Sequence, residues 1–255
     1  MTLLTNFRHK NLKPGVHQFL HSNDDTGLSF SICQLAAGET IEPGEDHFET
    51  AALVIHGSGT ISSGSDSHYF NRPDWIKHSP WAIHLPPRQK GAITARTACK
   101  IALLKTRNQE TFPEKTYLPS EVSTEHRGKG QLDDTCYRHV RLVFDRTIAP
   151  PEARLVLGEV LNYPGRWSSY PPHHHRQPEI YYYEFSPSEG YGHGELGNEV
   201  YHIRHQDLLK ITENRDHSQV AAPGYHLYYL WAIRHLDNNP YTGFEFTPPH
   251  DKLLS

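Results

Sequence analysis

Short apolar segments separated by proline and glycine constrain the fold of this chain more than any other feature. The 255 residues include 19 prolines and 18 glycines. β-branched, aromatic and aliphatic residues recur over 28–35, 51–55, 81–85, 100–104, 155–161, 180–185, 199–204, 208–212 and 225–233. Turn residues bound these segments, for example at 57–59 and 223–224, and no helical periodicity runs through them. Many short strands at regular spacing predict an all-β protein built as a sandwich or barrel.

The apolar rhythm stops between residues 108 and 134. That segment carries Pro113, Pro119, several glutamates and a basic, glycine-rich run at 127–130. Such a composition is typical of a connection between two folded parts. We therefore predict an N-terminal β-barrel over 1–107, a connection over 108–134 and a C-terminal β-barrel over 135–255.

Charge and cysteine content exclude several classes of protein. The chain has 25 basic and 29 acidic side chains and a net charge of -4, so a dedicated nucleic-acid surface is not expected. Cys33, Cys99 and Cys136 form no C-x-x-C pair, which argues against a thiolate zinc site and a disulfide framework. Residues 1–13 lack the apolar run of a signal peptide, and no segment approaches the ~20 apolar residues of a membrane span. We expect a cytoplasmic protein with no membrane partner.

A histidine cluster in the C-terminal half carries the clearest chemistry. Residues 167–183 read WSSYPPHHHRQPEIYYY. In an extended chain His173 and His175 share one face and His174 points to the other. Glu179 follows a turn at 176–178 that can return it to the histidines, and His217 is placed to add a ligand from a later strand end. Three imidazoles and a carboxylate suit one divalent ion, Zn or Mn first and Fe, Ni or Co as alternatives. The alternative is a solvent-exposed histidine run without a metal.

The same pattern, H-x-H followed by Glu and a distant His, resembles the metal motif of cupins. Further stretches resemble the 5-deoxy-glucuronate isomerase family of inositol catabolism, which is related to 5-keto-4-deoxyuronate isomerase: RGKG at 127–130, LGEV at 157–160, WSSYPPH at 167–173, EIYYYEF at 179–185 and APGYHLYYL at 222–230. This resemblance is strong in the C-terminal half. In the N-terminal half it depends mainly on PWAIHLPP at 80–87.

The resemblance implies a bicupin, with two double-stranded β-helix barrels in one chain. It implies that His173, His175, Glu179 and His217 bind the metal, and that the reaction interconverts an aldose-type uronate and its ketose. Our chain has Arg176 where the family usually has Asp. The substrate is therefore left open between 5-deoxy-glucuronate and another small sugar acid. We also expect a homo-oligomer.

Aldose–ketose isomerisation needs a base that moves a proton between neighbouring carbons, and a cation that stabilises the enediolate. By alternation Tyr181 and Tyr183 share the inward face of Glu179, while Tyr182 and Glu184 face outward. The catalytic candidates are Tyr183, Tyr229 and His226, the last two from the 225–233 segment. Tyrosines on strands more often serve packing, with the hydroxyl bonded to a neighbour. For the substrate carboxylate the candidate cations are Arg166 and Arg204.

Two other functions fit the same sequence. A cupin dioxygenase would use iron at the same ligands, and oxygen-dependent turnover would identify it. A non-catalytic sugar-binding cupin would retain sugar affinity without proton exchange. In the N-terminal half His47, Glu49 and His84 could be remnants of a second metal set, but no H-x-H is present there, and we expect that barrel to be metal-free.

Overall fold

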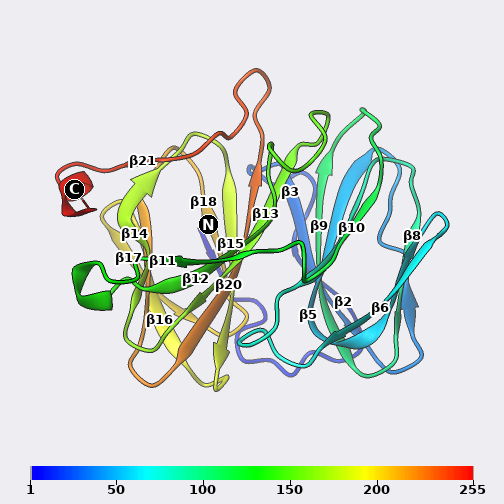
Figure 1. Cartoon of the computed structure of the whole chain (residues 1–255), viewed down its shortest axis with the longest axis horizontal. Helices are drawn as coiled ribbons and strands as arrows, with labels where there is room; N and C mark the ends of the chain where they lie inside the picture. Colours follow the sequence, from blue (N-terminus) through cyan, green and yellow to red (C-terminus); the bar gives the residue numbers. More distant parts are fainter. Residues whose placement is uncertain (1, 255) are drawn as a thin grey trace. The chain divides into compact units, whose positions relative to one another are not determined.

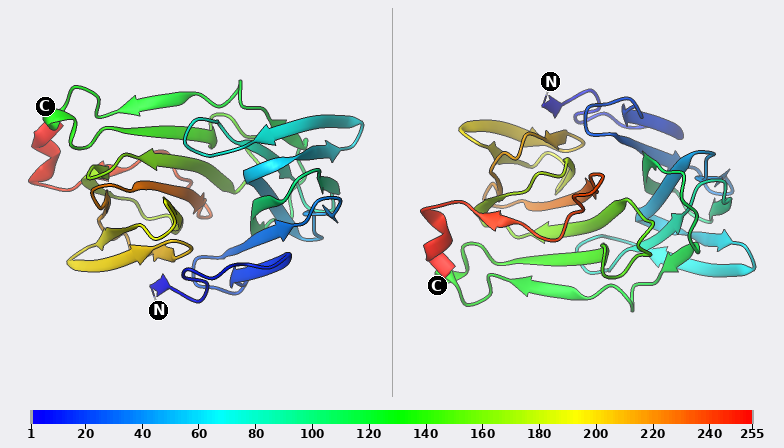
Figure 2. Two further views of the ribbon diagram at one scale, coloured as in Figure 1. Left: turned by 90° about the horizontal axis from the view of Figure 1, so that it is seen from below. Right: turned by 90° about the horizontal axis from the view of Figure 1, so that it is seen from above.

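The structure is a computed structural model that describes residues 2–254. These residues form strands and two short 3₁₀ turns, η1 (Leu132–Asp134) and η2 (His250–Leu254), and contain no α-helix (Figures 1 and 2). The all-β prediction is confirmed. No helix in this part of the chain is long and apolar enough to cross a membrane.

Two compact units make up the chain, and each draws on separate segments. Unit 1 combines the residues up to Lys10 with Thr124–Leu142 and the residues from Leu157 onward. Unit 2 combines Asn11–Ser123 with Val143–Val156. The predicted connection 108–134 contains two short strands, of which β10 belongs to unit 2 and β11 to unit 1. The domain boundaries at 107 and 135 stay a prediction, because the units are interleaved along the sequence.

Unit 2 is built from antiparallel strands around one apolar core. Its main sheet has the order β10-β7-β5-β9-β3-β2, while β6 and β8 pair with β5 and β4 pairs with β8. The strands are β2 (Gly15–Leu20), β3 (Leu28–Leu35), β4 (Thr40–Ile41), β5 (Phe48–Ser63), β6 (Asp66–Arg72), β7 (Trp81–Leu85), β8 (Gly91–Ala95), β9 (Cys99–Arg107) and β10 (Lys115–Tyr117). The long strand β5 pairs with β7 and β9 through its first half and with β6 and β8 through its second half. Its apolar side chains therefore enter one core from both parts of the sheet.

Unit 1 consists of two antiparallel sheets. One has the order β1-β18-β15-β20-β13-β12-β11 and the other β17-β16-β19-β14-β21. The strands are β1 (Leu3–Leu4), β11 (Thr124–Arg127), β12 (Arg138–Phe144), β13 (Leu155–Asn162), β14 (Trp167–His174), β15 (Glu179–Ser186), β16 (Tyr191–Leu196), β17 (Glu199–Arg204), β18 (Leu208–Ile211), β19 (His217–Ala221), β20 (His226–Arg234) and β21 (Glu245–Phe246). Val160, Tyr181 and Tyr229 from the first sheet pack with Leu196 and Ile203 from the second. The core of unit 1 lies between the two sheets.

Strand β15 shows how alternation positions the site. Tyr181 and Tyr183 belong to the core between the sheets, on the face of Glu179. Tyr182 and Glu184 lie on the opposite face, as alternation requires, but they are buried rather than exposed. The Tyr182 hydroxyl donates to the Glu184 carboxylate at 3.0 Å. The opposite face of β15, to which these two residues were predicted to point, is therefore buried as well and carries its own polar partners.

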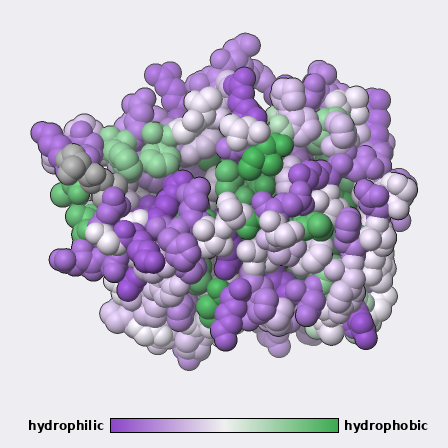
Figure 3. Space-filling view, in the orientation of Figure 1, coloured by the Kyte–Doolittle hydropathy of each residue, from purple (hydrophilic) through white to green (hydrophobic). Residues whose placement is uncertain are grey.

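Large apolar side chains are mostly inside. The exposed ones among the described residues are Val16, Tyr69, Ile148, Tyr191, Val200 and Leu253. The face in Figure 3 is accordingly coloured mainly purple and white, for polar and intermediate residues.

Candidate metal centre

Three strand ends of unit 1 bring the histidine cluster together. Strand β14 pairs with β19 so that His173 and His217 are direct partners in register. His175 follows the last residue of β14, and after a turn at 176–178 Glu179 opens β15. Strand alternation leaves His173 and His175 buried and His174 half-buried.

His175, Glu179 and His217 form a compact group that could hold a metal ion. One ligand atom from each lies within 4.8 Å of the others, and all three residues are buried. The Glu179 Oε2 atom is 3.0 Å from His175 Nε2 and 3.4 Å from His217 Nε2. Ligand atoms around one Zn²⁺ or Mn²⁺ ion at about 2.0–2.2 Å would be separated by similar distances. The spacing of these donors therefore fits a single divalent cation.

The hydrogen bonding and charge of these histidines also fit a cation. The His217 Nε2 and His175 Nδ1 atoms are buried and have no hydrogen-bond partner. Burial, followed by the carboxylate of Glu179 acting in the opposite direction, leaves the pKa of His217 below its usual value. A neutral imidazole with a free nitrogen is the form that binds a metal. His217 therefore offers a buried Nε2 atom without a partner to a cation, while His175 Nε2 faces Glu179 Oε2 at 3.0 Å.

His173 lies beside this group rather than within it. Its ring centroid is 4.3 Å from that of His217, and the ring of Phe244 covers it at 4.2 Å. Burial first, and then the neighbouring imidazoles, hold the pKa of His173 well below its usual value, so it too is neutral. His174 points away, with its Nδ1 atom 3.0 Å from Asp216. The structure thus brings three of the four predicted ligands into one group and places the fourth in ring contact with it.

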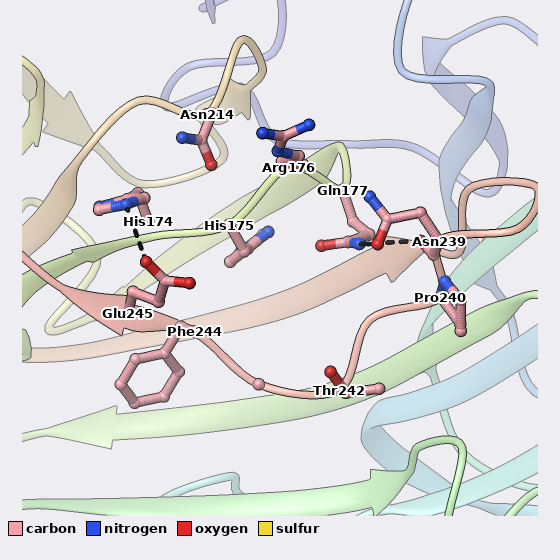
Figure 4. A pocket seen from close by; sticks show the side chains of 11 residues that line it. His174, His175, Arg176, Gln177, Asn214, Asn239, Pro240, Thr242, Phe244 and Glu245 are labelled. Carbon is pink, nitrogen blue, oxygen red and sulfur yellow. Dashed lines mark hydrogen bonds and ion pairs between the residues drawn. The ribbon is translucent and has the colours of Figure 1, made fainter.

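A cavity of about 470 Å³ opens beside His175. Its polar lining includes Arg176, Gln177, Asn214 and Asn239, which lie above and to the right of His175 in Figure 4. The Gln177 amide donates to the Asn239 carbonyl at 2.8 Å. This volume and lining suit a small polar molecule.

The predicted catalytic tyrosines lie deeper in unit 1. The Tyr183 hydroxyl donates to Gln219 at 2.7 Å, and the Tyr229 hydroxyl bonds with Ser169 at 3.1 Å. Burial raises the pKa of both tyrosines, so their hydroxyls are protonated and can donate hydrogen bonds but are poor bases. Tyr181, which the sequence placed on the inward face but not among the catalytic candidates, has its ring centroid 5.8 Å from that of His217, and Tyr241 has its centroid 5.0 Å from that of His175.

The other three predicted site residues lie away from this group. His226 opens β20 opposite Ser186, whereas Glu179 pairs with Ile233, seven residues further along. That offset is about 23 Å of strand. Arg166 lies over the rings of Tyr137 and Tyr163, at 5.1 and 5.4 Å from their centroids. Neither Arg166 nor Arg204 is among the described residues that line the cavity. Their roles stay predictions that this geometry does not support.

The corresponding residues of unit 2 form a different arrangement. Glu49 is fully buried and accepts four hydrogen bonds, from His84 at 2.8 Å, Asn108 at 2.9 Å, and the backbone N–H groups of Arg154 at 2.7 Å and Leu155 at 3.0 Å. The His84 ring stacks on Phe144, with centroids 4.2 Å apart. His47 is exposed. The carboxylate is engaged by protein donors, as expected for a structural anchor.

The chain is similar in sequence to proteins of a known family. The sequence model of the KduI/IolB family matches residues 3–253. The chain belongs to the KduI/IolB family. Among its curated relatives, a protein of Geobacillus kaustophilus named 5-deoxy-glucuronate isomerase is 29% identical over 224 residues, covering 80% of this chain and 78% of the relative. A protein of the same name from Lacticaseibacillus casei is 26% identical, covering 90% and 91%. The family predicted from the sequence is confirmed.

Solved structures confirm the bicupin fold. An IolB-like protein from Salmonella typhimurium LT2 superposes with a TM-score of 0.86 at 22% identity, with complete coverage of both chains. Oxalate decarboxylase from Lactobacillus farciminis superposes with a TM-score of 0.69 at 11% identity, covering 96% of this chain and 88% of that one. The sequence identities are low, so the two superpositions show a shared fold between this KduI/IolB family member and the two solved structures.

Proposed function

We propose that this protein is a metal-dependent isomerase that interconverts a small sugar acid of aldose type and its ketose, with 5-deoxy-glucuronate as the substrate. Membership of the KduI/IolB family and the names of the curated relatives support an isomerase. The observation that carries metal dependence is the buried group of His175, Glu179 and His217, in which His217 Nε2 has no hydrogen-bond partner and both histidine Nε2 atoms face the Glu179 carboxylate. A place in inositol catabolism and a cytoplasmic location remain part of this proposal.

The reaction moves hydrogen without any net oxidant. A base removes the proton from C2 of the aldose, the electron pair forms an enediolate, and a proton returns at C1 while the O2 proton passes to O1. The ketose has the same atoms and electrons as the aldose. The bound divalent cation would supply Lewis acidity to the two oxygens on which negative charge develops.

The chain's own residues contribute position and hydrogen bonds. His175, Glu179 and His217 would hold the cation, with His173 beside them. Tyr181, whose pKa is raised by burial and by the Glu179 carboxylate, stays protonated. Its hydroxyl, bonded to Ser169 at 3.2 Å, is a donor for a substrate oxygen. These side chains are buried, and the lower local dielectric strengthens each of these interactions.

The test follows conversion of 5-deoxy-glucuronate by NMR in D₂O. Chelation should abolish both turnover and deuterium incorporation beside the carbonyl, and one equivalent of Zn²⁺ or Mn²⁺ should restore both. His175→Ala should lose metal and activity together, by at least about 100-fold.

The matched control is His193→Ala, which removes an exposed histidine of β16 and should behave as wild type. Exchange that persists in the chelated protein would rule out the proposed role of the metal. Turnover that consumes oxygen would instead identify a dioxygenase.

A further inference from the structure

A buried arginine faces the interior of unit 1. Arg138 opens β12, two residues before Val140, which belongs to the core between the two sheets. Alternation places Arg138 on the same inward face. It is 8% exposed, and its charge acts on the hydroxyls of Tyr181 and Tyr229. It also acts on the imidazole of His173, beside the metal group.

No acidic side chain balances this cation within residues 2–254. The guanidinium has one hydrogen bond there, from Nη1 to the carbonyl of Cys136 at 2.8 Å. Burial lowers the pKa of Arg138, which reflects the cost of removing its charge from water. The nearby buried Arg141, by contrast, is 2.9 Å from Glu159. A buried charge without a partner is costly, and a fork of N–H groups without acceptors suits a carboxylate.

A second buried donor on the opposite sheet is also without an acceptor. Gln219 on β19 lies two residues from His217, on the same face, and is the register partner of Ser168 on β14. Its Oε1 atom accepts from Tyr183, but its Nε2 atom has no partner. A side chain at Gly194 would come within 2.7 Å of Gln219 Oε1, so glycine leaves room there. The interior thus holds one buried amide donor without an acceptor, in addition to the guanidinium of Arg138 with its single hydrogen bond.

We propose that Arg138 binds the carboxylate of the sugar acid between the two sheets of unit 1, and that the Gln219 amide donates to one of its hydroxyls. This inference rests on the proposed function. In an open-chain uronate the carboxylate and the aldehyde are at opposite ends of the carbon chain. With the aldehyde end at His175, Glu179 and His217, the carboxylate lies away from the metal group, and Arg138 is the buried cation between the two sheets that would meet it. Arg138 therefore sets specificity for an acid over a neutral sugar.

The experiment compares 5-deoxy-glucuronate with the neutral analogue in which a hydroxymethyl group replaces the carboxylate. Arg138→Gln should lower kcat/KM for the acid by at least about 100-fold, mainly through KM, because a buried charged pair loses one partner. For the neutral analogue the change should stay below about 3-fold, since that molecule never uses the cation. Equal losses on both substrates, or no loss on either, would overturn the assignment.

Two further variants keep the test decisive. Arg138→Met replaces the buried charge by an apolar chain of similar length, which cores usually tolerate, and should show the same loss of selectivity. Arg127→Gln removes an exposed arginine at the register partner of Arg138 and should leave both substrates unaffected.

A binding assay separates this inference from the proposed function. Calorimetry should show that D-glucuronate binds the metal-loaded wild type at least about 10-fold more tightly than D-glucose, and that Arg138→Met abolishes this preference. If the wild type binds D-glucuronate in this way without isomerising any uronate, the isomerase proposal fails and the role of Arg138 stands. If isomerisation occurs but Arg138→Met keeps the preference, the role of Arg138 fails and the isomerase stands.

Discussion

Replacing Glu49 by glutamine should destabilise unit 2 without removing a metal. The carboxylate accepts two hydrogen bonds at each oxygen: His84 and the Leu155 N–H at Oε1, and Asn108 and the Arg154 N–H at Oε2. In Glu49→Gln one oxygen becomes an NH₂ group that faces two donors. Each buried donor left without an acceptor costs about 1–3 kcal/mol. His84 can change tautomer and recover one bond, so one or two donors lose their acceptor and we expect a loss of about 2–4 kcal/mol.

The assay is urea unfolding of Glu49→Gln beside Glu110→Gln, which makes the same change at an exposed position close in sequence. The control should stay within about 0.5 kcal/mol of wild type. Metal content should be equal in all three proteins. If Glu49→Gln is as stable as the control, Glu49 is not a structural anchor of unit 2. If Glu49→Gln loses a bound metal ion, unit 2 holds a cation.

Two other variants or conditions test the geometry. Gly158→Ala should destabilise by about 1–3 kcal/mol, because a Cβ there would lie 2.3 Å from the Trp231 ring; unfolding unchanged from wild type would mean that the indole moves aside at no cost. The metal-free protein should lose stability as pH falls below about 6.5, by about 1.4 kcal/mol per pH unit for each histidine that stays neutral when folded. His173 and His217 have lowered pKa values in the folded protein, so the unfolded chain takes up protons that the folded chain does not. Urea unfolding at several pH values between 7.5 and 5.5 measures how the free energy of unfolding depends on pH. A free energy of unfolding that does not change over this range would contradict the prediction.

Strand positions were predictable where local pattern and turn residues agree. The predicted segments 28–35, 81–85 and 199–204 coincide with β3, β7 and β17, because prolines or glycines lie beside alternating apolar residues. Strand β14 was not among the predicted segments, because Pro171 and Pro172 lie within it. The structure accommodates both prolines at a register shift between Ser168 and His173, where no ladder partner is needed.

The site was predictable only as far as local periodicity reaches. Alternation places His173 and His175 on one face, and one turn returns Glu179 to them. His217 joins them through pairing of distant strands, which no local pattern encodes. Arg138 and Gln219 carry no motif in the sequence, and their importance appears only when burial and missing hydrogen-bond partners are known.

Cation binding to the chelated protein tests the central claim most directly. Titration with Zn²⁺ or Mn²⁺ should give one tightly bound ion per chain in the wild type. His217→Ala removes a ligand atom from the group of three and should abolish stoichiometric binding, while His193→Ala should retain it. A wild type that binds no ion, or a His217→Ala protein that still binds one with unchanged affinity, would contradict the metal centre described above.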